Sequence, residues 1–254
     1  MKVAVAGGTG SVGRHIVEVL GARGHAVVPM SRKSGVDVVT GKGLAEALAG
    51  VEVVIDAATG PSPEQKAATD FFTAAAGNLQ KASAQAGVKR ILVVSIIGID
   101  TFKAGYQAAK IAHERAMLAG PVPVRIVRAA QFHELVERMI EWGRQGDVAY
   151  VPRMRTQLVA ARTVAERIAD LATPPAADGG IVEIAGPRAE EMVDAARRLS
   201  ARRGDGLRIE GASDPADPDA GLYESGVLLP GPDAILGGPT FPAWLESAPL
   251  GRTR

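Results

Sequence analysis

The sequence predicts an α/β protein built on an open, doubly wound parallel sheet, with a smaller lobe in its C-terminal half. Short continuous runs of Val, Ile, Leu and Ala alternate with amphipathic helical stretches over the first half of the chain. Such runs are typical of strands that are buried on both faces. Aromatic residues make up only 4% of the chain beside 30 glycines, so small aliphatic side chains must form the core. Strands that alternate with helices form right-handed βαβ units.

Six apolar runs are expected to be strands, and four helical stretches separate them. The strands are residues 2–6, 26–30, 36–39, 51–56, 90–95 and 122–127, and the helices are 11–23, 43–48, 63–86 and 103–118. The third helix has Ser62 as its expected N-cap, Pro63 at its first position and Gly87 just after its end.

The alternation loosens after about residue 130. Helices are expected at 134–144, 163–172 and 189–203, with a strand at 180–184, and the Pro-, Gly- and Asp-rich stretch from Gly211 onward is expected to be irregular. We therefore expect a core over residues 1–130 and a smaller lobe over residues 131–254 that packs on it as part of a single structural unit.

The composition excludes several classes of protein. The chain has no cysteine, which excludes a disulfide scaffold and a cysteine-based metal site. Its 29 basic and 28 acidic side chains give no electrostatic reason to expect nucleic acid or an anionic membrane as a partner. No apolar run approaches the roughly 20 residues of a membrane span, and no signal peptide is recognisable, so a cytoplasmic location is expected. The four histidines lack metal-ligand spacing.

A glycine-rich turn follows the first strand and opens the first helix. Its sequence is Gly7-Gly-Thr-Gly10-Ser-Val-Gly13. In this context Gly7 allows a tight turn, Gly10 lets the backbone approach a pyrophosphate, and Gly13 allows close packing of helix and strand. The phosphates would rest on the positive end of the helix that begins near Ser11. The turn predicts a dinucleotide-binding Rossmann-type core, with Gly7, Thr9, Gly10, Ser11, Val12 and Gly13 at the cofactor.

The end of the second strand indicates which dinucleotide is bound. Enzymes that prefer NAD place an Asp or Glu there, on the ribose 2′-hydroxyl. Here the stretch is Met30-Ser-Arg-Lys33, without a carboxylate. Ser31, Arg32 and Lys33 are instead suited to pair with a 2′-phosphate, which predicts NADP(H) as the cofactor.

Three polar residues are expected at the carboxyl edge of the sheet. Ser95 ends the fifth predicted strand, and Tyr106 and Lys110 share one face of the next helix. Together with the glycine turn, this set resembles the short-chain dehydrogenase/reductase superfamily over about the first 130 residues. Three further segments resemble its atypical, NmrA-like branch. They are Ala57-Ala-Thr59, Gly77-Asn-Leu-Gln-Lys-Ala82 leading into Ala86-Gly-Val-Lys-Arg-Ile91, and Gln131-Phe-His133.

The resemblance implies a role for each of these residues. Tyr106 would be the general acid, Lys110 would stabilise its phenolate and hold the nicotinamide ribose, and Ser95 would steady the substrate oxygen. It also implies cofactor contacts from Ala57, Ala58, Thr59, Ser95, Lys110 and Gln131. Substrate contacts are expected from Ile97, Phe132, His133, Trp142 and Met154, under a roof formed by residues 131–142 and a loop over residues 150–158. Where many members carry an Asp that binds adenine, this chain has Thr40-Gly41-Lys42.

The sequence therefore predicts an NADPH-dependent reductase that transfers hydride to a carbonyl or quinone-like small molecule. Two alternatives stay open: a non-catalytic NADPH sensor of the NmrA type, and a nucleotide-sugar epimerase. The expected partner is a small-molecule substrate, and a homo-oligomer is compatible with the sequence.

Overall fold

The computed structural model describes residues 1–173 and 179–247 of the chain. The chain divides into two compact units. The first consists of Met1–Arg128 and Arg162–Val182, and the second of Ala129–Ala161 and the chain from Glu183 onward. The boundary expected at residue 130 lies close to the observed one after Arg128. The second unit is not one continuous stretch, however, because Arg162–Val182 belong to the first unit.

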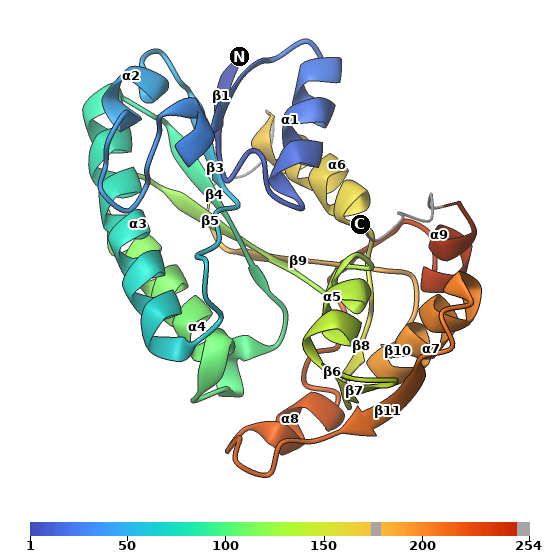
Figure 1. Ribbon diagram of the computed structural model, residues 1–254. Helices are drawn as coiled ribbons and strands as arrows, with labels where there is room; N and C mark the ends of the chain where they lie inside the picture. The colour runs from blue at the N-terminus through green and yellow to red at the C-terminus, as the bar shows by residue number, and fades with distance from the viewer. Residues whose placement is uncertain (174–178, 248–254) are drawn as a thin grey trace. The chain divides into compact units, whose positions relative to one another are not determined.

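A parallel seven-stranded sheet forms the centre of the fold, with the strand order β12-β9-β5-β4-β3-β1-β2 (Figure 1). Ala4 on β1 lies in register with Val28 on β2 and with Val54 on β3. The predicted doubly wound Rossmann-type sheet is therefore confirmed. In chain order the strands are β1 (Lys2–Ala6), β2 (Ala26–Met30), β3 (Val53–Asp56), β4 (Arg90–Ile96), β5 (Val124–Ala129), β9 (Ile181–Ala185) and β12 (Ile235–Leu236).

Small aliphatic side chains form the core of the first unit, as expected. Ala4, Val54 and Ile91 on neighbouring strands are fully buried, and Leu48 and Leu79 from helices close the same cluster. Because the residues of β3 are all buried, that strand is a continuous apolar run that ends in a buried Asp56.

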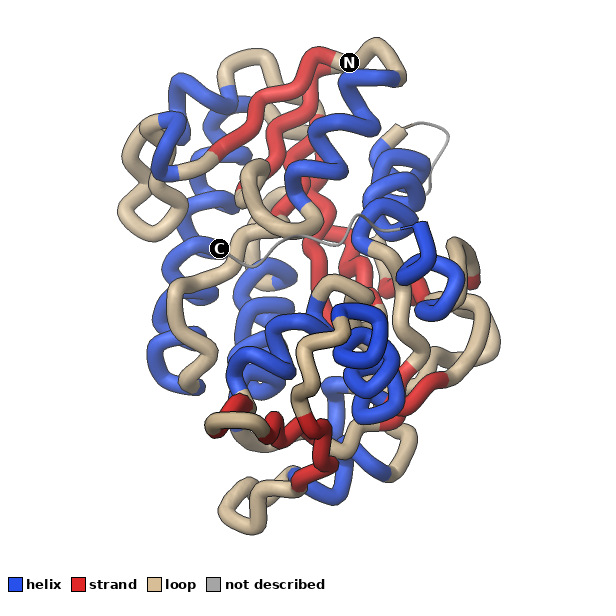
Figure 2. Tube along the Cα trace, turned by 45° about the vertical axis from the view of Figure 1, so that its right-hand side comes forward, coloured by secondary structure: helices blue, strands red, loops and turns tan. Residues whose placement is uncertain are grey.

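The helices of the first unit cover both faces of the sheet. In Figures 1 and 2, α3 and α4 lie side by side on one face, and α1 and α6 lie on the other. The helices are α1 (Gly13–Ala22), α2 (Leu44–Leu48), α3 (Gln65–Ala86), α4 (Gly105–Leu118) and α6 (Ala161–Ala172), with short 3-10 turns η1 (Arg32–Ser34) and η2 (Ile99–Thr101). Helix α3 ends at Gly87, with φ +73°, as predicted. Its expected start at Ser62 and Pro63 is wrong, because the Glu64 carboxylate caps the helix by accepting from the amides of Lys66 and Ala67.

The expected strand at residues 36–39 is also wrong. The Asp37 carboxylate accepts a hydrogen bond from the Val39 amide, and the Asp37 amide donates to the Lys42 carbonyl, which closes a compact loop. The Asn78 side chain on α3 donates to the carbonyls of Val38 and Val39. These groups therefore bond within the loop and to α3 rather than to a neighbouring strand.

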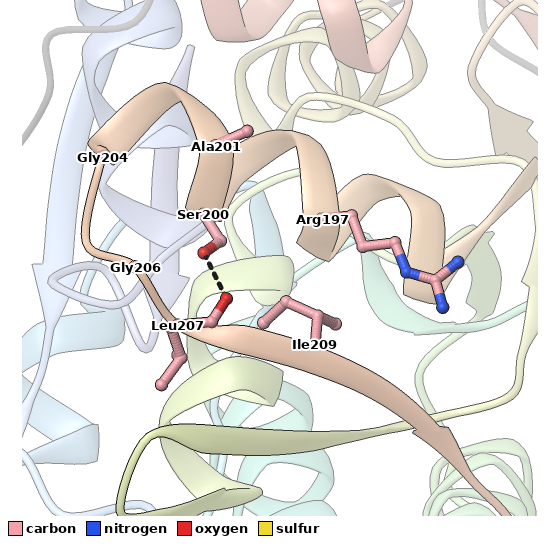
Figure 3. A pocket seen from close by; sticks show the side chains of 7 residues that line it. All are labelled: Arg197, Ser200, Ala201, Gly204, Gly206, Leu207 and Ile209. Carbon is pink, nitrogen blue, oxygen red and sulfur yellow. Dashed lines mark hydrogen bonds between the residues drawn. The ribbon is translucent and has the colours of Figure 1, made fainter.

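The second unit contains more regular structure than the sequence indicated. Strand β11 pairs in parallel with β7, so the expected loop at residues 150–158 is partly strand. The last turn of α7 is joined to β11 by the Ser200 hydroxyl, which donates to the Leu207 carbonyl (3.0 Å; Figure 3). The elements are α5 (Leu135–Trp142), β6 (Arg144–Gln145), β7 (Val148–Pro152), β8 (Arg155–Thr156), β10 (Glu190–Glu191), α7 (Met192–Arg203), β11 (Arg208–Ala212), α8 (Ala220–Glu224) and α9 (Phe241–Ser247). The stretch expected to be irregular after Gly211 thus holds α8, β12 and α9.

No helix in the described ranges is both long enough and apolar enough to cross a membrane.

Candidate cofactor and active site

The glycine-rich turn is closely packed at two of its glycines and open at the third. Gly7 has φ +70°, and a Cβ there would lie 2.6 Å from the Ala57 carbonyl oxygen. A Cβ on Gly13 would lie 2.0 Å from the Gly7 carbonyl oxygen. Gly10 is exposed, and its Cβ would approach only that same oxygen, at 3.1 Å. Gly7 and Gly13 are therefore required by packing, and Gly10 leaves a bare backbone surface.

The positive end of the helix that follows this turn is not capped by a side chain. Helix α1 begins at Gly13 with Val12 as N-cap, without a side-chain cap and without an acidic residue in the first turn. Helix N-termini leave backbone amides unpaired and favour anions. Thr9 is exposed and Ser11 is half-buried beside it. The turn and helix end thus fit the pyrophosphate of a dinucleotide.

The basic residues after β2 lie close to this turn. The Gly8 amide donates to the Met30 carbonyl at 3.3 Å, which places the end of β2 beside the turn. Ser31 then caps the short η1 turn by accepting from the Ser34 amide, and Arg32 and Lys33 are exposed. Two cationic side chains are therefore available next to the glycine-rich turn.

The segment after β3 lies against the same turn. The Ala57 amide donates to the Ala6 carbonyl at 3.0 Å, and the Ala58 amide donates to Asp56 Oδ1 at 3.0 Å. Ala58 is buried and Thr59 is exposed. The structure thus brings the predicted Ala57 segment and the glycine-rich turn together.

The Lys110 side chain reaches the backbone of β4 at the residue before Ser95. Lys110 Nζ donates to the carbonyl of Val94 at 2.8 Å, next to Ser95. The Ser95 hydroxyl is buried and has no hydrogen-bond partner among the residues that the structure describes. Burial lowers the pKa of Lys110 to about 8, although the nearby carboxylates of Asp56 and Glu114 oppose this shift.

Tyr106 lies one helical turn before Lys110, with its ring packed edge-on against Phe72 at 5.7 Å between centroids. Burial and the negative charge of Asp56 raise the pKa of Tyr106 to about 12. The expected lowering of the Tyr106 pKa by Lys110 is therefore wrong, because the Lys110 ammonium donates to Val94 and His113 instead. At neutral pH the phenol is protonated.

Two residues that the sequence did not single out complete this cluster. His113 Nδ1 lies 2.9 Å from Lys110 Nζ, and His113 Nε2 lies 2.9 Å from Asp56 Oδ2. His113 and Asp56 are each 1% exposed. The available sequence indication was spacing, since His113 is at i+3 from Lys110 and therefore shares its face of α4. Within residues 1–173 and 179–247, no group of three or more metal-binding side chains could hold an ion.

A second charge cluster, in which Arg128 and Glu114 are buried and Asp100 is exposed, holds the loop after β4. Arg128 on β5 donates to both carboxylate oxygens of Glu114, at 3.0 and 2.8 Å, and to both oxygens of Asp100 on η2, at 2.5 and 2.8 Å. The bidentate geometry fixes η2 relative to α4 and β5. The loop that follows Ser95 is therefore tied down at its far end.

The remaining residues that were predicted to contact substrate or cofactor differ in how far they are exposed. Ile97 in the first unit is 1% exposed and Met154 in the second is 4% exposed, so neither presents a wall to a substrate here. Phe132 is half-buried, and Trp142 at the end of α5 is 63% exposed. Gln131 is buried and its side-chain oxygen accepts from the Thr156 hydroxyl.

His133 is enclosed by aromatic rings within the second unit. Its ring lies 5.4 Å from Phe241 and 5.1 Å from Trp244, between centroids. Burial lowers its pKa to about 4, so the imidazole is neutral in the folded protein. Neither ring nitrogen makes a hydrogen bond of ordinary geometry to a described residue. His133 is thus a packed aromatic side chain under α9.

Comparison with known proteins agrees with this geometry. A family model described as NAD(P)H-binding matches residues 7–173, which is more than half of the chain, so the protein belongs to this NAD(P)H-binding family. The fold is shared with a solved protein of the short-chain dehydrogenase/reductase superfamily. None of the curated proteins compared matches the sequence.

Solved structures share the fold at low sequence identity. A short-chain dehydrogenase/reductase superfamily protein from Agrobacterium tumefaciens with bound NAD is 16% identical, with a TM-score of 0.68 over 97% of this chain and 95% of that one. The dTDP-4-dehydrorhamnose reductase of Bacillus anthracis in complex with NADP is 16% identical, with a TM-score of 0.68 over 96% and 97%. MoeE5 in complex with UDP-glucuronic acid and NAD is 18% identical, with a TM-score of 0.69 over 97% and 98%.

Proposed function

We propose that the protein is an NADPH-dependent reductase that transfers hydride to a carbonyl or quinone-like small molecule, with Tyr106 as proton donor. One observation carries the proposal. Lys110 is anchored to the Val94 carbonyl, beside the unpaired hydroxyl of Ser95 and one turn after Tyr106, in the same unit as the open glycine-rich turn.

Each of these side chains has a defined task in such a reduction. The bound cofactor supplies the hydride to the substrate carbon. The Ser95 hydroxyl donates to the substrate oxygen, where negative charge develops, and Tyr106 gives that oxygen its proton. A phenol with a pKa of about 12 is protonated at neutral pH and is still a stronger acid than an alcohol, so its proton transfer to an alkoxide is downhill.

The choice of NADPH over NADH rests on the end of β2. Arg32 and Lys33 are exposed there, and no carboxylate stands in Met30–Ser34. A 2′-phosphate forms charge-assisted hydrogen bonds with such side chains, whereas a ribose hydroxyl gains much less from them.

The solved relatives suggest which substrates to test beside simple ketones and quinones. Two of the similar structures are a dTDP-4-dehydrorhamnose reductase and a protein bound to UDP-glucuronic acid. We therefore extend the proposed class of small-molecule substrates to keto sugars on a nucleoside diphosphate.

The test follows the absorbance of reduced nicotinamide with the purified protein, NADPH and a panel of these three substrate types. We expect turnover with at least one type and a loss of about 10²- to 10⁴-fold in kcat for Tyr106→Phe. The control is Tyr223→Phe on α8, which removes a phenol from the second unit and is expected to leave kcat unchanged. NADPH binding without turnover across the panel would favour a sensor and refute the reductase.

A further inference from the structure

We propose that Asp56 and His113 are positioning residues for Lys110, forming a buried relay that aims its ammonium group and supplies the counter-charge that keeps it protonated. The consequence for the cofactor rests on the proposed function, in which Lys110 holds the nicotinamide ribose. The relay itself is a property of the protein alone.

The direction of the hydrogen bonds follows from the chemistry of the three groups. An ammonium group only donates, so His113 Nδ1 must accept from Lys110 Nζ across their 2.9 Å separation. A neutral imidazole carries its proton on the other nitrogen, so Nε2 donates to Asp56 Oδ2, also at 2.9 Å. The second Asp56 oxygen accepts from the Ala58 amide and fixes the carboxylate. The relay therefore has one tautomer and one direction.

One aromatic ring shields the relay from water. Phe72 on α3 stacks on His113 at 4.6 Å with 19° between the ring planes, and Lys110 Nζ lies 4.5 Å from the centroid of the same ring. Phe72 is 1% exposed and Lys110 is 4% exposed. In such surroundings a hydrogen bond to a charged group is stronger than in water.

Four elements face Lys110, and two of them, β3 and α4, carry a charged group. Asp56 ends β3 and reaches Lys110 through His113, while Val94 on β4 offers only a carbonyl. Glu114 on α4 also raises the pKa of Lys110, but its two oxygens are held by Arg128. Phe72 on α3 presents an uncharged ring. Asp56 is therefore the carboxylate that is linked to Lys110 by hydrogen bonds within the described chain.

A purely structural role would not require this arrangement. A buried ionic network is on average no more stabilising than apolar side chains of similar volume. Here the network ends on Lys110, which bonds to the backbone next to Ser95 and lies one helical turn from Tyr106. A fixed positive charge at this place serves a bound ligand, whereas apolar packing would not.

The first test measures NADPH affinity against pH by nicotinamide fluorescence. In the wild type we expect affinity to fall with a midpoint near pH 8, as Lys110 loses its proton. Asp56→Asn keeps an acceptor for His113 but removes the charge, so the midpoint should move down by about one pH unit. The control Asp70→Asn, on the exposed face of α3, should leave the midpoint unchanged. The cofactor's 2′-phosphate titrates near pH 6, on the acid side of this range.

The second test separates positioning from folding. His113→Gln retains an acceptor for Lys110 and a donor for Asp56, whereas His113→Leu retains neither. We expect the Gln variant to keep NADPH affinity within about threefold of the wild type, and the Leu variant to lose more than about tenfold at equal thermal stability. Equal losses in the two variants, or an unchanged midpoint in Asp56→Asn, would overturn the relay.

The third test needs neither a variant nor a cofactor. Nitrogen NMR of the histidine side chains should show His113 as a neutral Nε2–H tautomer at about pH 6, where an exposed imidazole is largely charged. The opposite tautomer, or a charged ring, would overturn the relay. A wild-type protein with this tautomer but without NADPH binding would refute the proposed function and leave the relay standing.

Discussion

The close approach of Gly13 to Gly7 allows a sharp test, because helix α1 contains a second glycine in open surroundings. A Cβ on Gly13 would lie 2.0 Å from the Gly7 carbonyl oxygen and 2.8 Å from its carbonyl carbon. Both are backbone atoms, so the helix and the turn must separate by roughly 1 Å or more before the added Cβ reaches ordinary van der Waals contact. At Gly21 in the same helix, no atom lies within 4 Å of the added Cβ.

The two substitutions to alanine should therefore have opposite signs. Alanine is favoured over glycine in a helix by about 0.5–1 kcal/mol, so Gly21→Ala should stabilise the protein by a few tenths to 1 kcal/mol. Gly13→Ala gains the same helix term but overpacks the turn, for a net loss of about 1–3 kcal/mol. Since the turn must move, Gly13→Ala should also weaken NADPH binding, and Gly21→Ala should not.

Urea unfolding followed by circular dichroism measures the free energy of unfolding, and a fluorescence titration measures NADPH affinity. Stabilisation by both alanines would show that the turn tolerates a side chain at Gly13. The packing explanation for this glycine would then be wrong.

Three further predictions concern charge. Arg32→Glu should weaken NADPH binding by about 10- to 100-fold in the same titration and should change NADH binding little. The control Arg198→Glu, at another exposed arginine, should bind NADPH as the wild type does. Unchanged NADPH affinity in Arg32→Glu would refute the 2′-phosphate assignment. Because the pKa of His133 is lowered in the folded protein, its contribution to the free energy of unfolding is full above about pH 6.5. This contribution is lost as the pH falls towards 4, by at most about 3 kcal/mol. His133→Phe should remove the contribution in urea melts across that range. Arg128→Leu leaves the buried Glu114 carboxylate without its bidentate partner and should cost about 3–5 kcal/mol of unfolding free energy, part of which Glu114→Leu in the same chain should restore.

The sequence predicts the first unit well because its strands are buried on both faces. Such strands appear as apolar runs, and β1, β2 and β4 lie within one residue of their expected bounds. The failure at residues 36–39 has a physical reason. Val36 is buried, as an apolar pattern indicates. The Asp37 carboxylate accepts a hydrogen bond from the Val39 amide, however, and this turn takes the place of strand pairing.

The second unit was less predictable because its strands are short and pair over long separations. Arg208 on β11 pairs with Val148 on β7, and β11 itself, Arg-Ile-Glu-Gly-Ala, contains no continuous apolar run. Helix α9 begins at Phe241 after a stretch rich in glycine and proline, which favours a loop prediction.

The candidate site was predicted by motif where the motif is local. The glycine-rich turn and the spacing of Tyr106 and Lys110 are visible in a single stretch each. The pairing of Asp56 with His113 joins residues 57 apart, and a buried carboxylate at a strand end has no sequence pattern of its own. Only the folded chain brings Asp56, His113 and Lys110 within hydrogen-bond distance of one another.

The placement of the two tryptophans gives the protein a built-in reporter. Trp142 and Trp244 both belong to the second unit, while the first unit, which carries the glycine-rich turn, contains none. Intrinsic tryptophan emission therefore monitors the second unit alone, whereas far-ultraviolet circular dichroism sums over both. Coincident denaturation curves from the two probes would mean that the units unfold as one cooperative body, and separated curves would give each unit its own stability.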